Sequence, residues 1–202
     1  MAEAKAPNRM EKKKEQTRLK LIEVALKLFA EQGFAATTME QIAAVADVAK
    51  GTLYNHFPSK EDIVAAYVQT VNKQARPAIE DLLGNLPDTR SRLLNVLLQA
   101  FDWFELNREL LVAYIVFRLQ NLAKNLPEPE ERSGFTVILA MIFRQGQRDG
   151  EIRRDVAAEY LADSFNMIYF KTLSDWLNKP DEYPLHEQLA RDIELFLDGA
   201  NR

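Results

Sequence analysis

The sequence predicts an all-α protein with an N-terminal three-helix head, which carries a helix-turn-helix, and a larger C-terminal helical body. Apolar residues recur three and four positions apart along most of the chain, which is the period of an amphipathic helix. Prolines and glycines interrupt this pattern where helices are expected to end. Within residues 37–60 two short helical patterns flank a sharp break, which indicates a helix-turn-helix. We therefore expect a head over residues 1–60 and a body over residues 61–202.

The composition limits the classes of function. The chain has 202 residues, of which 47% are apolar, so it can bury a core. It has no cysteine, which excludes disulfides and thiolate metal sites and suits a cytoplasmic location. No apolar run approaches the roughly 20 residues that span a membrane, and the charged N-terminus does not resemble a signal peptide. With only His56 and His186 and no phosphate-binding glycine loop, we expect no metal, no cofactor and no enzyme.

The charge is unevenly distributed along the chain. The net charge is −4, yet residues 1–60 hold ten Lys and Arg against seven Asp and Glu. The remaining residues hold sixteen against twenty-three. Because neutralising phosphates drives much of DNA binding, the head suits DNA and the body would repel it. Lys5, Arg9 and Lys12 to Lys14 either follow a DNA backbone or form the solvated start of a helix.

Three helices are expected in the head, over residues 11–32, 39–45 and 49–57. Gly33 ends the first helix, since glycine enters the left-handed region cheaply, and Phe34 should pack back on it. Thr38 and Gln41 fit a capping box at the start of the second helix. Pro58 stops the third, because proline lacks the N–H and disfavours helix before it.

The third predicted helix presents the candidate DNA-binding side chains. Leu53 and Phe57, four residues apart, should be buried and leave a polar face outward. This helix is the second of the two helices of the helix-turn-helix, and in such motifs the second helix enters the major groove. There Lys and Asn side chains form hydrogen bonds with base edges, and Thr contacts a thymine methyl. Gly51 lowers the stability of the helix. Glycine stands at this position either by chance or because the backbone approaches DNA closely there. The candidate DNA contacts are Thr37, Thr38, Ala49, Lys50, Gly51, Thr52, Tyr54, Asn55, His56 and Lys60.

These residues resemble the tetracycline-repressor (TetR) family of bacterial transcription regulators. The resemblance covers about residues 15–65 and rests on Ala25, Phe29, Gly33, Phe34, Thr37, Thr38, Ile42, Ala43, Ala46, Val48, Lys50, Gly51, Thr52, Leu53, Tyr54, His56, Phe57, Ser59, Lys60 and Glu61. It implies an all-helical homodimer that binds a palindromic operator and releases it when a small ligand binds. The chain departs from the family at Asp47, where glycine is usual, and at Ala49, where serine is common.

The body is predicted to be helical throughout. Ser59 should cap a helix that reaches at least residue 73, and Pro77 either kinks it as a hinge or breaks it before a second helix. If Pro77 breaks the helix, the second helix covers residues 78–86. The further helices are expected over residues 90–106, 109–126, 133–147, 156–177 and 185–197. An exposed acidic loop is expected over residues 127–131. Asp155 should cap the helix over residues 156–177.

The last two predicted helices carry apolar residues on more than one face, which favours pairing with a second copy. A ligand pocket is expected inside the body, although the pattern of each candidate residue favours ordinary core over a pocket lining. Arg118 is the most informative, because a buried arginine needs a carboxylate from the protein or from a ligand. The pocket candidates are Phe101, Phe104, Tyr114, Phe117, Arg118, Phe143, Phe165 and Tyr169.

The sequence therefore predicts a transcriptional regulator, most simply a repressor, whose partners are double-stranded operator DNA, a small-molecule effector and a second copy of itself. A different class remains open, namely a helical protein-interaction module with a vestigial DNA-binding head. The intact polar face of the predicted reading helix argues against that alternative.

Overall fold

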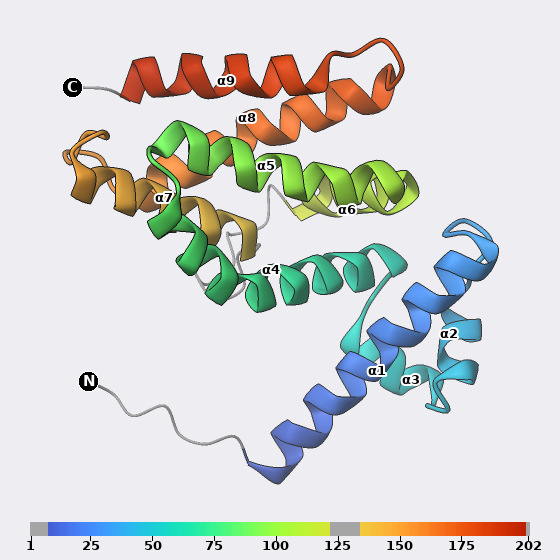
Figure 1. The fold of residues 1–202 in the computed structure, drawn as a ribbon. Coiled ribbons are helices and arrows are strands. Elements are labelled where there is room, and N and C mark those ends of the chain that lie inside the picture. Colours follow the sequence, from blue (N-terminus) through green and yellow to red (C-terminus); the bar gives the residue numbers. More distant parts are fainter. Residues whose placement is uncertain (1–7, 122–133, 201–202) are drawn as a thin grey trace. The chain divides into compact units, whose positions relative to one another are not determined.

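The computed structural model describes residues 8–121 and 134–200, and every regular element in these ranges is an α-helix (Figure 1). The predicted all-α class is therefore confirmed. The helices are α1 (Arg9–Gln32), α2 (Met39–Val45), α3 (Lys50–His56), α4 (Lys60–Asn85), α5 (Thr89–Leu106), α6 (Arg108–Asn121), α7 (Gly134–Asp149), α8 (Ala158–Asn178) and α9 (Leu185–Ala200). Among the described residues, no helix is long and apolar enough to cross a membrane.

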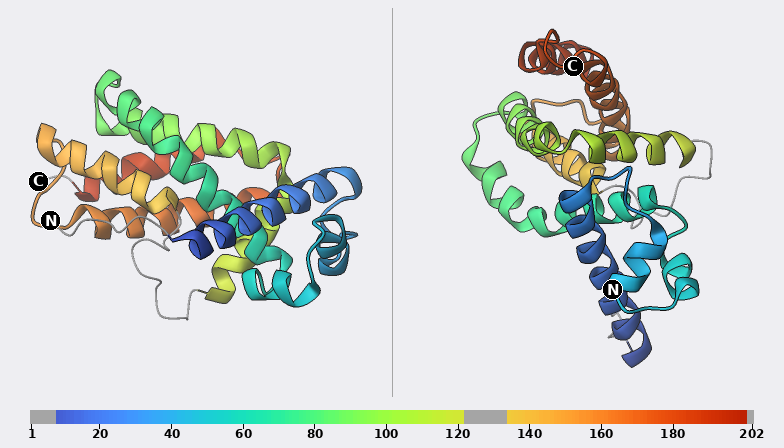
Figure 2. Two further views of the ribbon diagram at one scale, coloured as in Figure 1. Left: turned by 90° about the horizontal axis from the view of Figure 1, so that it is seen from below. Right: turned by 90° about the vertical axis from the view of Figure 1, so that its right-hand side faces the viewer.

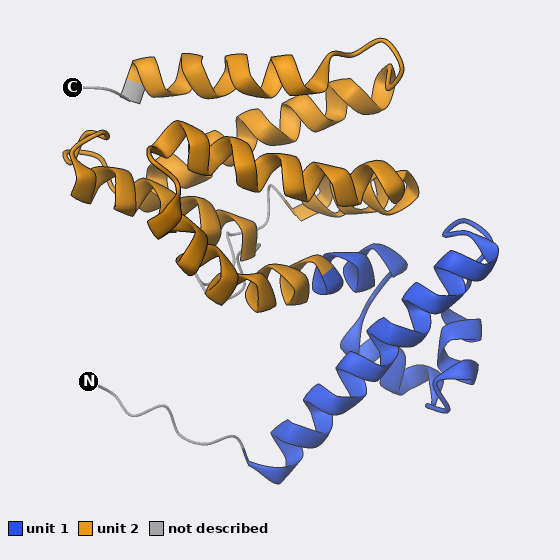
Figure 3. Ribbon diagram, in the orientation of Figure 1, with its two compact units in different colours: residues 1–67 blue, residues 68–202 orange. Residues whose placement is uncertain are grey.

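The chain divides into two compact units, Met1–Tyr67 and Val68–Arg202 (Figure 3). The division falls inside α4, later than the head–body boundary after Lys60 that the sequence suggests. Unit 1 holds α1, α2, α3 and the start of α4, and further views of these helices are given in Figure 2. Unit 2 holds the rest of α4 and the helices α5 to α9.

The core of unit 1 forms because each helix buries one apolar stripe. In α1, α2 and α3 the stripe falls at helical spacing, and α2 packs against both α1 and α3. The buried apolar residues are Leu21, Ile22, Ala25, Phe29, Met39, Ile42, Ala43, Ala46, Leu53, Phe57, Ile63, Val64, Ala65 and Ala66. Phe34 packs back on Phe29 with ring centroids 4.9 Å apart, as predicted.

Local capping sets most helix ends in unit 1. Gly33 has φ 86°, which confirms its predicted role after α1, and Thr38 and Gln41 form the predicted capping box of α2. The start of α1 was predicted too late, at residue 11. Asn8 and Glu11 form a second capping box, so α1 begins at Arg9.

α4 is one continuous helix with Pro77 inside it. The alternative of a break followed by a separate helix over residues 78–86 is therefore wrong. A proline inside a helix removes one backbone hydrogen bond and costs about 3 kcal/mol. The C-terminal part of α4 survives because it is held from outside: Leu83 is buried, and a buried arginine binds the final carbonyls.

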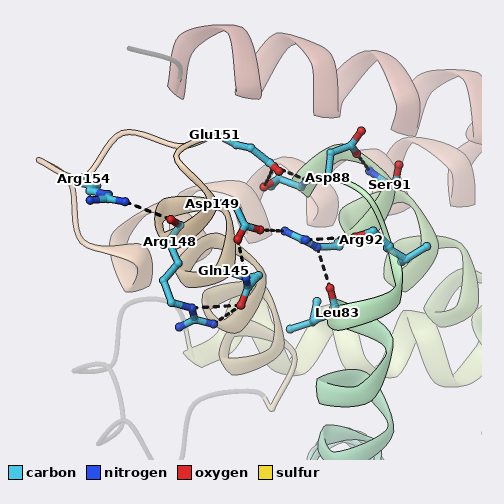
Figure 4. A network of polar contacts seen from close by, with 11 residues as sticks. Leu83, Asp88, Ser91, Arg92, Gln145, Arg148, Asp149, Glu151 and Arg154 are labelled. Atoms are coloured by element: carbon cyan, nitrogen blue, oxygen red, sulfur yellow. Dashed lines mark hydrogen bonds and ion pairs between the residues drawn. The ribbon is translucent and has the colours of Figure 1, made fainter.

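That arginine, Arg92, is the centre of what we call the Arg92 node, where the ends of α4, α5 and α7 meet (Figure 4). Its Nε donates to the Leu83 carbonyl and its Nη2 to the Leu86 carbonyl, each at 3.1 Å. Its Nη1 lies 2.8 Å from Asp149 Oδ2 at the end of α7, which lowers the pKa of that carboxyl. The orphan carbonyls of one helix end are thus satisfied by a side chain from the next helix.

The rest of the core of unit 2 is built mainly from α7 and α8, which pack against each other, with α5 and α9 packed around them. Phe143 and Phe165 are almost fully buried and meet edge to face at 6.1 Å. Asp88 caps α5, because its side chain accepts a hydrogen bond from Ser91 N. The predicted cap at Asp155 is wrong: Asp155 pairs with Arg153, and α8 begins at Ala158. The acidic loop over residues 127–131 lies outside the described residues.

Candidate nucleic-acid interface

The helix-turn-helix consists of α2, a short turn and α3. Val48 N donates to Ala43 O at 3.0 Å, and Asp47 N donates to Ala44 O at 3.1 Å. Asp47 has φ 53°, in the left-handed region that aspartate tolerates better than most residues. The turn therefore forms without the glycine that is usual at this position in the family that the sequence resembles.

α3 turns one side inward and the other outward. Leu53 and Phe57 are 0% and 3% exposed, so the helix is anchored at the two predicted positions. Lys50, Gly51, Tyr54 and Asn55 are exposed and share the opposite face, while Thr52 and His56 are half-buried. The structure thus brings these six candidates together on one short helix.

The candidates around α3 differ in what their side chains do. Thr37 is 1% exposed, and its hydroxyl donates to Gly33 O at 2.8 Å, so Thr37 positions the loop before α2. Thr38 is exposed, with its hydroxyl in the capping box. Ala49 precedes α3 and gives it no side-chain cap.

Lys60 is already engaged inside unit 1. Its Nζ donates to Phe34 O at 2.6 Å and to Ala35 O at 3.4 Å, and it lies 4.5 Å from the centre of the Phe34 ring. A lysine in the first turn of a helix is unfavourable because it faces the positive end of the helix dipole, and these contacts offset that cost. An ammonium has three N–H donors, so one remains for a phosphate.

Cations of α1 approach the C-terminal end of α3. The pKa of His56 is lowered, mainly by burial and then by the charges of Lys14 and Arg18. Arg18 also lies over the Phe57 ring at 5.8 Å. Lys14 belongs to the basic run seen in the sequence, whereas nothing in the sequence indicates Arg18, because only the folding of unit 1 brings Arg18 close to Phe57 and His56.

Lys50 forms an ion pair across the helix-turn-helix. Its Nζ lies 3.7 Å from Glu40 Oε1, and the two side chains are 67% and 49% exposed. Glu40 was not singled out in the sequence, since nothing local signals a contact between residues ten positions apart across a turn.

The pocket candidates occupy several places in unit 2. Phe101, Phe104, Tyr114, Phe143, Phe165 and Tyr169 are buried, whereas Phe117 and Arg118 are half-buried. Their rings meet in separate groups: Phe101 contacts Trp176, Phe104 stacks on Tyr114, and Phe143 and Phe165 join Phe196. Burial, together with the nearby Tyr114, raises the pKa of Tyr169, whose hydroxyl donates to Leu97 O at 3.4 Å.

Two arginines of unit 2 have different surroundings. Arg118 donates to the Tyr114 hydroxyl at 3.4 Å and lies over the Phe170 ring at 6.0 Å, beside a shallow hollow. Arg76, on α4, has a buried Nε with no hydrogen-bond partner in the described part of the chain. In residues 8–121 and 134–200, no three His, Cys, Asp or Glu side chains gather into a group that could hold a metal.

Comparison with known proteins finds a family that matches the N-terminal part of the chain. A family model described as bacterial regulatory proteins, tetR family, matches residues 21–67. The chain is 24% identical over 191 residues to the fatty acid metabolism regulator protein of Bacillus subtilis (strain 168), covering 94% of this chain and 98% of that protein.

Solved structures agree on the fold. The crystal structure of Thermus thermophilus FadR, a TetR-family transcriptional repressor in complex with lauroyl-CoA, matches with a TM-score of 0.74 and 23% identity, over 90% of this chain and 94% of that one. FadR from Bacillus subtilis in complex with stearoyl-CoA matches with a TM-score of 0.62 and 24% identity, over 90% and 98%. At these identities the structural likeness concerns the fold alone.

Proposed function

Because the chain belongs to the TetR family of bacterial regulatory proteins, we propose that it is a repressor that binds a palindromic operator and leaves it when a small molecule binds. The observation that carries this proposal is the α3 face, where exposed Lys50, Gly51, Tyr54 and Asn55 lie opposite a buried Leu53. Such a helix has the size and the donors to read a major groove. It acts by binding alone, in the cytoplasm, where its operator would be.

A homodimer would present two α3 helices to two half-sites about one helical turn apart, or a multiple of that. Exposed apolar residues on the last two helices support self-pairing through them: Tyr160 and Met167 on α8 are 68% and 42% exposed, and Leu195 on α9 is 73% exposed. Burying such side chains against a second copy stabilises a two-fold interface.

The effector we propose is a long-chain acyl-coenzyme A thioester. Two structures of similar fold are complexes with lauroyl-CoA and stearoyl-CoA. An acyl chain would have to separate the buried aromatic side chains of unit 2, which would then surround it, and the buried Nε of Arg76 would donate to an anionic group. Binding would reach the DNA-binding unit through α4, which begins in unit 1 and continues into unit 2.

Selection from a random duplex library at low salt tests the DNA-binding part. We expect a palindromic sequence to be enriched, and lauroyl-CoA to weaken its binding about 5- to 150-fold, the range of typical allosteric couplings. Failure to retain any duplex would refute DNA binding and support the interaction module. If the protein retains a duplex, and lauroyl-CoA, coenzyme A and laurate all leave that binding unchanged, only the proposed class of effector is refuted.

A further inference from the structure

The ion pair between Glu40 and Lys50 places a carboxylate beside the proposed DNA-binding face of α3. Glu40 lies in the first turn of α2 and Lys50 is the first residue of α3. Both side chains are well exposed, and their charged atoms are 3.7 Å apart. A carboxylate so close to a candidate reader would face the phosphates of any bound duplex and repel them.

We propose that Glu40 is a selectivity residue, which holds Lys50 away from phosphates and so weakens binding to DNA of the wrong sequence. This inference rests on the proposed DNA-binding function. In a non-specific complex Lys50 would have to leave Glu40 to neutralise a phosphate. In the specific complex Lys50 donates to acceptors on a base edge, and its three N–H groups allow it to keep Glu40 as a second partner.

The size of the effect follows from the exposure of the pair. Exposed ion pairs contribute little, so releasing Lys50 should tighten binding to a random duplex by about two- to fivefold. A lysine that is free to neutralise one more phosphate should also steepen the dependence of log K on log salt, by about 0.9. Both changes should be smaller for the selected duplex, where Lys50 keeps its base contact.

The test compares the full-length protein and Glu40→Gln on two probes, the duplex enriched by selection and a random-sequence duplex of equal length. We expect the variant to bind the random duplex more tightly, to show the steeper salt dependence there, and to lose part of its preference for the selected duplex. Unchanged binding of the random duplex, weaker binding of both probes, or equal tightening of both would each overturn the proposal.

Unit 1 offers a matched control. Lys27 and Glu31 form another exposed pair, 3.9 Å apart, with side chains 73% and 56% exposed. Glu31→Gln removes the same charge and should leave the ratio of the two affinities unchanged. If it shifts that ratio as much as Glu40→Gln does, the effect belongs to net charge and the proposal falls.

A double-mutant cycle ties the effect to the pair itself. In a Lys50→Met background, Glu40→Gln still removes the repulsion of its own charge from both duplexes, but it should no longer shift the ratio of the two affinities, because the cation that it releases is gone. A shift as large as in the wild-type background would overturn the proposal. Wild-type protein that binds neither probe would instead refute the proposed function, so the two failures are distinguishable.

Discussion

Replacing Arg92 by methionine should destabilise unit 2 far more than the same change at Arg90, although both arginines lie in the first turn of α5. The Arg92 side chain is 6% exposed and donates three hydrogen bonds, to Leu83 O, Leu86 O and Asp149. Its loss would leave two helix-end carbonyls without this donor and a carboxylate without its partner.

The magnitude follows from burial. Breaking a buried pair costs about 3–5 kcal/mol, and a hydrogen bond to a charged group contributes about 1.5–3 kcal/mol. Asp149 is 32% exposed, so water can take over part of its contact, and we expect a loss of about 2–4 kcal/mol in the free energy of unfolding. Arg90 lies closer to its partner Glu194, at 2.5 Å, but both side chains are about half exposed, so Arg90→Met should cost under about 1 kcal/mol.

Urea unfolding followed by tryptophan fluorescence measures this difference selectively. Both tryptophans of the chain, Trp103 and Trp176, lie in unit 2, so the signal reports on the unit that contains the Arg92 node. If Arg92→Met does not fold, Asp149→Asn keeps the bonds of Arg92 to the α4 carbonyls and should fall between the two arginine variants. Equal losses for Arg92→Met and Arg90→Met would refute the argument that burial decides the contribution.

Three further predictions concern single positions. Gly51→Ala should stabilise unit 1 by about 1 kcal/mol in thermal melts, because alanine favours helix and a Cβ at this position meets nothing within 4 Å. If the backbone approaches DNA closely here, the same change should weaken binding to the selected duplex. Tighter binding would contradict close approach. Lys60→Ala should lower the free energy of unfolding of unit 1 by about 1–2 kcal/mol, because Phe34 O loses its donor; an unchanged melting temperature with weaker DNA binding would assign Lys60 to phosphate contact alone. Asp88→Ala should cost unit 2 about 1 kcal/mol at neutral pH. The hydrogen bond from Ser91 N lowers the pKa of Asp88, so this stabilisation is present above the ordinary value of 3.8 and is lost as the pH falls further; a cost that persists at pH 2 would exclude the charged cap.

The features that the sequence predicted well are those that local chemistry decides. The capping box of Thr38 and Gln41, the left-handed Gly33 and the buried pair Leu53 and Phe57 each follow from residues within a few positions of one another. The same logic was available for the Asn8 and Glu11 box, and the late start predicted for α1 came from weighing periodicity over capping.

The features that the sequence could not predict depend on residues far apart in the chain. The contact of Lys60 with Phe34 spans 26 positions, and that of Arg92 with Asp149 spans 57. Rules that use only neighbouring residues cannot identify the partners of Lys60 and Arg92. The same limit explains α4: proline chemistry favours a break at Pro77, whereas the burial of Leu83 and the Arg92 node keep the helix intact beyond it.

The intact but proline-bearing α4 has a consequence for how the chain opens in solution. Position 77 supplies no amide hydrogen, so the carbonyl of Lys73 receives no backbone bond from the next turn. Amides in the turns beside this gap should exchange with deuterium sooner than those near Ile63 and Val64, which are fully buried. The exchange-labile turn would then lie in the one helix that is shared by both units, shortly after the division between them.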